Sequence, residues 1–137
     1  MTLFEYIEQH STPENDVLRT ITRNTNLHVL NPHMLSGQVQ GRVLSMLSHM
    51  LRPQRILELG TFTGYSALCL AEGLAEDGRM ITLEHNDELE DTIRKHLSLS
   101  ELGSKIDQRV ATGRGRTTAA EPRAERLRLR PLLHGCR

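Results

Sequence analysis

Two glutamates and two glycines are the residues of this chain whose types and spacing point to chemistry. Glu58 stands inside the apolar run 55–59, Gly60 and Gly64 follow it, and Glu84 ends a second apolar run. A carboxylate in a buried strand is costly unless hydrogen-bond donors or a cationic ligand neutralise it. Glycines after a strand let the backbone approach a ligand, and the N–H groups of a following helix point into the same space. The pattern predicts a site for a nucleotide-like ligand with a positive charge.

The hydrophobic pattern defines the elements that must position these residues. Residues 55–59 predict a buried strand, Gly60 ends it, and apolar residues then repeat at helical spacing from Ala67 to Ala75. In an open α/β sheet the ligand lies at the carboxyl ends of the strands, where this glycine turn falls. Residues 80–83 predict a second strand, so Glu84 stands where such sites hold the ribose hydroxyls. A strand-end glutamate that only faces water is the alternative.

The glycine spacing distinguishes this turn from the usual dinucleotide fingerprint. Gly60 and Gly64 form Gly-x-x-x-Gly rather than Gly-x-Gly-x-x-Gly, which weakens an NAD-binding interpretation. Residues 57–66 read Leu-Glu-Leu-Gly-Thr-Phe-Thr-Gly-Tyr-Ser. This stretch resembles the first motif of S-adenosylmethionine-dependent O-methyltransferases, and more narrowly of the cation-dependent caffeoyl-CoA and catechol type. A strand–helix corner with an incidental glutamate is the alternative.

The resemblance implies an S-adenosylmethionine site. Glu58 would lie near the cofactor's cationic end and Glu84 would bind the ribose. Met34 and Ser36 are assigned because the family's Met-x-Ser segment lies at a matching distance before the first strand. No catalytic residue is identified, and a single histidine such as His85 is more often a loop residue than a catalyst. The cofactor-binding residues implied are Met34, Ser36, Glu58, Gly60, Thr61, Phe62, Gly64, Tyr65, Ser66, Glu84 and His85.

The resemblance also implies methyl transfer to a hydroxyl of a small aromatic, catechol-type acceptor, with a divalent metal that chelates a vicinal pair of oxygens. The family's metal-binding aspartate and its later metal ligands cannot be placed in this chain. None of the seven histidines has metal-ligand spacing with another. We therefore expect no metal site and impaired activity in this chain.

The order of elements predicts an α/β protein with a Rossmann-like class I methyltransferase fold, of which only the N-terminal part is present. Three parallel strands with helices on both faces are expected, without the C-terminal strands, and the third strand, 105–110, would expose an edge. Helices are expected over 3–9, from 11–14 to about 30, and over 36–51. The last should be capped by Ser36. Its apolar residues, Val39, Val43, Met46, Leu47 and Met50, should cover the sheet.

The chain divides at about residue 110 into a partial cofactor-binding domain, 1–110, and an irregular tail, 111–137. The tail contains seven arginines and two glutamates and no apolar face. It is a basic arm that binds nucleic acid, a disordered surface segment, or a family domain translated in the wrong frame. We favour the third, because codons permitted for 129–136, read one nucleotide later, allow Phe-Asp-Leu-Phe-Phe-Met-Asp-Ala. The family carries such a strand, ending in Asp-Ala, at its metal site.

Composition limits the other classes of function. The chain of 137 residues has 17 basic and 17 acidic side chains and no long apolar run, so we expect one cytoplasmic domain without a membrane span or secretory signal. The tail lacks the interleaved aromatics of single-strand binders, which makes a nucleic-acid partner unlikely. A nucleotide-binding oxidoreductase fragment and a nucleic-acid binder remain the alternative functions. A homodimer is also compatible with the sequence.

Overall fold

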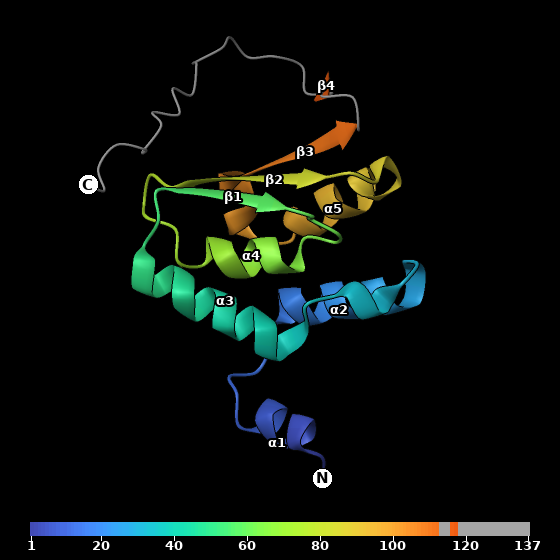
Figure 1. Cartoon of the computed structure of the whole chain (residues 1–137), viewed down its shortest axis with the longest axis vertical. Coiled ribbons are helices and arrows are strands. Elements are labelled where there is room, and N and C mark those ends of the chain that lie inside the picture. Colours follow the sequence, from blue (N-terminus) through green and yellow to red (C-terminus); the bar gives the residue numbers. More distant parts are fainter. Residues whose placement is uncertain (113–115, 118–137) are drawn as a thin grey trace, which may run out of the picture.

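The computed structural model describes residues 1–112 and 116–117, and a parallel sheet forms its centre (Figure 1). Strands β1 (Arg55–Leu59), β2 (Arg79–Glu84) and β3 (Ile106–Thr112) lie in that order, with Glu58 beside Thr82 and Thr82 beside Gln108. The three parallel strands confirm the predicted α/β class. The helices are α1 (Leu3–Gln9), α2 (Asp16–His28), α3 (Gly37–Leu51), α4 (Tyr65–Ala71) and α5 (Glu90–Leu97), with short 3-10 turns η1 (Pro32–Met34), η2 (Asp87–Leu89) and η3 (Glu101–Lys105).

The described helices cover one face of the sheet, so the expectation of helices on both faces is wrong for this part of the chain (Figure 1). The side chains of Ile56 and Met80 point into the core beneath α4 and α5, whereas Leu57 and Leu59 on the opposite face are 65% and 75% exposed. The reason is topological. Right-handed crossovers that add β2 and then β3 in the same direction place both connecting helices on the same face.

The sheet has a free edge on each side within the described residues. A short strand, β4 (Arg116–Thr117), pairs antiparallel with β3 at Ala111 and Thr112 only, so residues 106–110 pair with β2 alone and expose an edge, as expected. Among the described residues β1 also pairs with β2 alone. The predicted boundary at residue 110 stays a prediction, and the alternatives for the tail concern residues that lie mostly outside the described ones.

A compact core joins the sheet to α2, α4 and α5. Cys69 is buried in it as a small core residue, and burial raises the pKa of its thiol to about 11. His96 is also buried: Nδ1 donates to the carbonyl of Thr63 over 2.9 Å, and Nε2 faces the amide nitrogen of Asn24 at 3.4 Å. The apolar core residues are Leu18, Ile21, Tyr65, Ala67, Leu68, Cys69, Met80, Ile93 and Leu97.

Helix α3 has the predicted bounds, but the face that it buries is not the apolar face that was expected to pack on the sheet. It packs against α4 through Gly41, Ser45 and Ser48, which are buried. A Cβ at Gly41 would lie 2.7 Å from Cε1 of Tyr65, so the two helices approach closely at this point. The apolar stripe that was expected to cover the sheet faces outward instead: Val43, Met46, Leu47 and Met50 are exposed.

The amino-terminal helices begin at side-chain caps. Thr2 and Glu5 form a capping box at α1, which buries none of its residues. Helix α2 begins at Asp16, later than expected, because the side chain of Asn15 accepts a hydrogen bond from the N–H of Leu18 over 2.8 Å. Ser36 occupies the N-cap position of α3 but makes no side-chain cap bond. None of the helices in the described part of the chain is long and apolar enough to cross a membrane.

Candidate functional site

The connection from β1 to α4 is a tight turn that holds three residues in left-handed backbone conformations. Gly60, Phe62 and Gly64 have φ values of 91°, 52° and 87°. The N–H of Gly60 donates to the carbonyl of Leu83 over 2.8 Å, which ties the turn to the end of β2. A Cβ at Gly60 would meet no atom within 4 Å, so the space beside this residue is open to a ligand.

The carboxylate of Glu58 lies under this turn and accepts two hydroxyl hydrogen bonds. Ser66 donates to Oε1 over 2.7 Å and Thr82 donates to Oε2 over 2.5 Å. Thr61 contacts the hydroxyl of Thr82 at 2.6 Å and completes a chain of hydroxyls. Burial raises the pKa of Glu58 against the lowering effect of these bonds, and the charge of Glu84 raises it further. The two glutamates therefore lie at the same end of the sheet.

Glu84 ends β2 and is 9% exposed. Its Oε2 accepts from the N–H of Phe62 over 2.7 Å, and its Oε1 accepts from the N–H groups of His85 and Asn86 over 2.8 and 2.9 Å. The carboxylate thus fixes the glycine turn to the segment that follows β2. It does not simply face water.

Two adjoining cavities open over the turn, and they share Met34, Gly60 and Phe62. The larger, of about 510 Å³, has polar side chains such as Glu84 and Asn86 on its wall beside apolar ones such as Leu30 and Leu89. The smaller, of about 60 Å³, is lined by hydroxyl-bearing residues, including Ser36 and Ser66. The arrangement offers a large half-apolar chamber beside a small polar one.

Most of the predicted site residues line these cavities. The linings of the two together include Met34, Ser36, Gly60, Thr61, Phe62, Tyr65, Ser66 and Glu84. Glu58 lines neither cavity, but it accepts a hydrogen bond from Ser66, which lines the smaller one. Gly64 lines neither cavity: a Cβ there would lie 3.3 Å from Cδ2 of Leu97, so it serves helix packing. His85 also lies outside both linings.

Tyr65 connects the site to the amino-terminal part of the chain. Its ring is buried, and its hydroxyl donates to Glu14 over 2.6 Å. Burial and the nearby carboxylate raise the pKa of the phenol above its usual range. Glu14 also accepts from Thr22 over 3.0 Å, so one carboxylate joins α2 to the start of α4.

The sequence interpretation missed the wall formed by the loop after α2. Asn31 there adopts a left-handed conformation with φ of 56°, which allows the chain to turn before Pro32. The only local signal was Asn-Pro, which predicts the end of a helix and not a binding wall. The residues missed are His28, Val29, Leu30, Asn31, Leu35, Thr63, Asn86, Glu88, Leu89 and Thr92.

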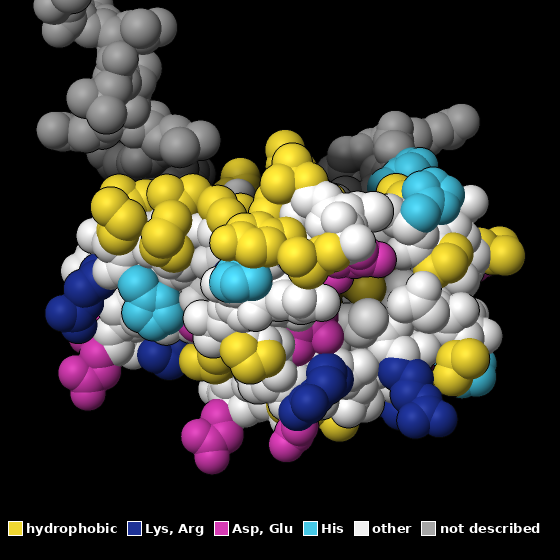
Figure 2. Space-filling view, turned by 90° about the horizontal axis from the view of Figure 1, so that it is seen from below, with side chains coloured by type: hydrophobic (Ala, Val, Ile, Leu, Met, Phe, Trp, Pro, Cys, Tyr) yellow, Lys and Arg dark blue, Asp and Glu magenta, His cyan; other side chains and the backbone are white. Residues whose placement is uncertain are grey.

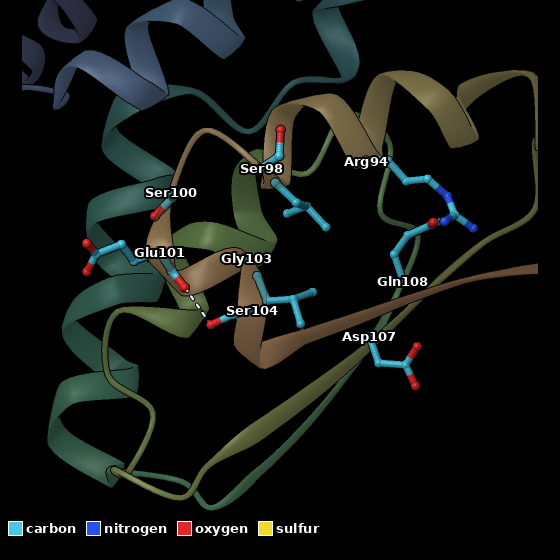
Figure 3. A pocket seen from close by; sticks show the side chains of 10 residues that line it. Arg94, Ser98, Ser100, Glu101, Gly103, Ser104, Asp107 and Gln108 are labelled. Atoms are coloured by element: carbon cyan, nitrogen blue, oxygen red, sulfur yellow. Dashed lines mark hydrogen bonds between the residues drawn. The ribbon is translucent and has the colours of Figure 1, made fainter. Parts of the chain in front are cut away.

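A third hollow, of about 610 Å³, lies between α5, η3 and β3, away from the turn (Figure 3). Ser98 and Ser104 on its wall already donate to the carbonyls of Lys95 and Glu101, each over 2.7 Å. Both polar atoms of the Gln108 amide are buried and have no partner among the described residues. Because these atoms are buried, a ligand in the hollow would not reach them. None of the predicted site residues lies here.

The described residues bring together no three His, Cys, Asp or Glu side chains that could hold a metal ion. The divalent metal implied by the resemblance, and its expected absence from this chain, stay predictions.

Taken together, the parallel strands, the glycine turn over their carboxyl ends and the carboxylate that ends β2 define an α/β protein with the arrangement found at nucleotide sites of open sheets. Comparison with known proteins gives the family. The family model described as O-methyltransferase matches residues 8–121. The chain belongs to this O-methyltransferase family.

Similar proteins share both sequence and fold with this chain. Catechol O-methyltransferase domain-containing protein 1 of Mus musculus is 34% identical over 79% of this chain and 41% of its own length. A catechol O-methyltransferase of Niastella koreensis is 30% identical over 79% of this chain and 50% of its own. The structure of an O-methyltransferase from Bacillus cereus in complex with SAH matches with a TM-score of 0.71 and 28% identity, over 77% of this chain and 48% of that one.

A second solved structure agrees. The O-methyltransferase from Streptomyces achromogenes involved in tomaymycin synthesis, in complex with SAM, matches with a TM-score of 0.70 and 28% identity over 82% of this chain and 48% of that chain. This chain therefore spans about half the length of the relatives that it matches.

Proposed function

We propose that this chain forms the S-adenosylmethionine-binding part of an O-methyltransferase, with the adenosine in the larger cavity and the methionine end in the smaller one. The observation that carries the proposal is the pair of cavities joined at Gly60. A half-apolar chamber with a carboxylate on its wall suits a nucleoside, and a small chamber with hydroxyls suits a charged amino acid group. Two of the similar solved structures are complexes with SAH and SAM.

Each predicted residue then has a physical task. Glu84 accepts a ribose hydroxyl while it holds the turn. Met34 and Phe62 lie at the junction of the chambers, beside the space open at Gly60. Ser36 and Ser66 face the methionine end, and Glu58 keeps Ser66 oriented and contributes negative charge beneath the sulfonium.

The reaction proposed is methyl transfer to a hydroxyl of a small aromatic acceptor. The acceptor oxygen forms a bond to the methyl carbon, the bond from that carbon to sulfur breaks, and sulfur keeps the electron pair. The hydroxyl proton leaves to solvent or a base, and S-adenosylhomocysteine is released. Much of the acceleration would come from holding oxygen, carbon and sulfur in line. Among the described residues no three His, Cys, Asp or Glu side chains come together to hold a metal, so we expect weak catechol methylation at most from this chain.

Titration calorimetry of the purified chain with S-adenosylhomocysteine, S-adenosylmethionine and NAD tests the proposal. We expect heat with the first two and none with NAD. Heat with NAD alone would replace the proposal with the oxidoreductase alternative. A folded chain that binds none of the three would refute it.

A further inference from the structure

One oxygen of Glu14 accepts two hydroxyl hydrogen bonds, and one of the two donors belongs to the candidate site. Oε1 of Glu14 accepts from the Tyr65 hydroxyl over 2.6 Å and from the Thr22 hydroxyl over 3.0 Å. Burial and the nearby carboxylate raise the pKa of the Tyr65 phenol, so the phenol keeps its proton and is the donor in this bond. Glu14 lines neither cavity of the site, so its influence on a ligand passes through Tyr65.

Tyr65 is packed tightly against a neighbouring helix. Its side chain is 1% exposed. A Cβ at Gly41 would lie 2.7 Å from Cε1 and 3.4 Å from the hydroxyl oxygen of Tyr65, so the ring lies against α3 and cannot move further toward it. The hydrogen bond to Glu14 then sets where the hydroxyl end of the ring lies.

The position of Tyr65 matters for the smaller cavity. Tyr65 lines this cavity together with Ser66, which follows it in the chain, and Ser36, which immediately precedes α3. Because Tyr65 lies against α3 and is bonded to Ser66, its position sets how far apart the two serines lie. The cavity has a volume of only about 60 Å³, so a small displacement of its wall changes which group fits.

The segment that carries Glu14 is itself anchored to the helical layer. Gln38 of α3 donates from Nε2 to the carbonyls of Glu8 and Thr12, over 3.0 and 3.3 Å. The hydroxyl of Thr22 holds the Glu14 carboxylate from the side of α2. The carboxylate is therefore a fixed point against which Tyr65 is held.

The negative charge of Glu14 is not isolated on its side of the molecule. Figure 2 views the chain from the side of α1, and acidic and basic side chains are scattered together over that face. Asp16 and Arg19, close to Glu14 in the chain, form an ion pair. Charges of both signs offset one another at a distance and are screened by salt, so an effect of Glu14 on a ligand requires its hydrogen bond to Tyr65.

We propose that Glu14 is a positioning residue for the methionine end of S-adenosylmethionine, and that it fixes the wall of the smaller cavity through the Tyr65 hydroxyl. This inference rests on the proposed function, in which the adenosine occupies the larger cavity and the methionine end the smaller one. Loss of the bond then weakens a ligand that fills both cavities and spares one that fills only the larger. S-adenosylhomocysteine is the first kind of ligand. Methylthioadenosine, which lacks the amino acid group, is the second.

Titration calorimetry of the full chain with these two ligands tests the inference. Glu14→Ala and Tyr65→Phe each remove one side of the bond. Each should weaken S-adenosylhomocysteine binding by about three- to tenfold, as for one hydrogen bond, and methylthioadenosine binding by less than about twofold. The double variant should bind no more weakly than the weaker single variant, since both changes remove the same bond. Glu14→Gln keeps an acceptor oxygen and should bind S-adenosylhomocysteine within about twofold of the parent chain.

Thr22→Val is the matched control, because it removes the other bond to the same oxygen and leaves the bond from Tyr65. It should change both affinities by less than about twofold. Fluorescence tests the bond itself. The chain has two tyrosines and no tryptophan, so Tyr6→Phe leaves Tyr65 as its one tyrosine. A hydrogen bond to a carboxylate quenches tyrosine emission, and Glu14→Ala in this background should therefore brighten it.

The outcomes separate a positioning role from a purely structural clamp between α2 and α4. Equal loss of affinity for the two ligands, or an equal loss in Thr22→Val, would overturn the inference and leave the proposed function intact. So would unchanged Tyr65 emission, or an unchanged affinity in folded Glu14→Ala. Tyr65→Phe carries the test if Glu14→Ala does not fold. A parent chain that binds neither ligand refutes the proposed function and this inference with it.

Discussion

Replacing Glu84 by glutamine tests the cofactor site most directly. The variant keeps the size of the side chain and one carbonyl oxygen but removes the charge and turns one acceptor into a donor. In the folded chain this carboxylate already accepts three backbone N–H bonds, from Phe62, His85 and Asn86. A carboxylate offers about four lone-pair positions, so about one remains for a ribose hydroxyl.

The expected loss of S-adenosylhomocysteine affinity follows from that single remaining lone-pair position. One hydrogen bond to a charged group contributes about 1.5–3 kcal/mol. At about 1.4 kcal/mol for each factor of ten, Glu84→Gln should weaken S-adenosylhomocysteine binding by about 10–150-fold. A carboxylate that held both ribose hydroxyls would lose roughly twice that free energy, so a larger loss would contradict this count. The variant also leaves a backbone N–H facing an amide group, which should cost about 1–3 kcal/mol of folding stability.

Calorimetry at a temperature well below unfolding separates these two effects, and urea denaturation measures the second one. Glu88→Gln is the control, because Glu88 lines the same cavity but is exposed. It should change affinity by less than about threefold, as for an exposed charge. Glu84→Asp keeps the charge and provides a second variant if the glutamine form does not fold. Folded Glu84 variants that bind S-adenosylhomocysteine as tightly as the parent chain would refute the ribose assignment.

Three further outcomes are expected. Gly60→Ala should lower the free energy of unfolding by about 1–2 kcal/mol in urea, since the residue has φ of 91° and the new methyl group meets no atom; an unchanged midpoint would argue against this backbone conformation. Burial lowers the pKa of His96, so the unfolded chain takes up its proton first, and stability should fall as pH drops below about 6.5. Urea midpoints between pH 5 and 8 should lose this slope in His96→Gln, and a slope that persists would place the linked proton elsewhere. In a Cys136→Ser background, Cys69 should react slowly with a thiol reagent at pH 8 and rapidly in urea, because its pKa is about 11; fast reaction of the folded chain would contradict its burial.

The part of the site that is local in sequence could be predicted from sequence. An apolar run, a glycine and a helical repeat place the turn at the end of β1, and the structure confirms that order. The position of Glu84 followed because a second strand parallel to β1 ends at the same edge of the sheet. The cofactor roles of these residues remain predictions that the calorimetry above will test.

The distant wall of the larger cavity could not be found in the same way. Leu30 and Asn31 are joined to the turn by no periodicity or motif, and they reach it only because α2 and α3 pack on the same side of α4. Glu58 shows a related difference. Its isolated position in an apolar strand predicted a compensating cation, but hydroxyls of Ser66 and Thr82 already occupy both of its oxygens. Hydrogen-bond donors that other elements supply cannot be predicted from the sequence of one strand.

The orientation of α3 shows what an amphipathic pattern can and cannot specify. Period 3.6 identifies the apolar face of a helix, but it does not identify the surface that covers that face. Here the face toward α4 is made of small residues, Gly41, Ser45 and Ser48, since only these permit the approach to Tyr65 that a Cβ at Gly41 would block at 2.7 Å. The apolar face is then left exposed. The spacing of apolar residues therefore predicted the helix correctly, but the expectation that this face covers the sheet is wrong for the described residues.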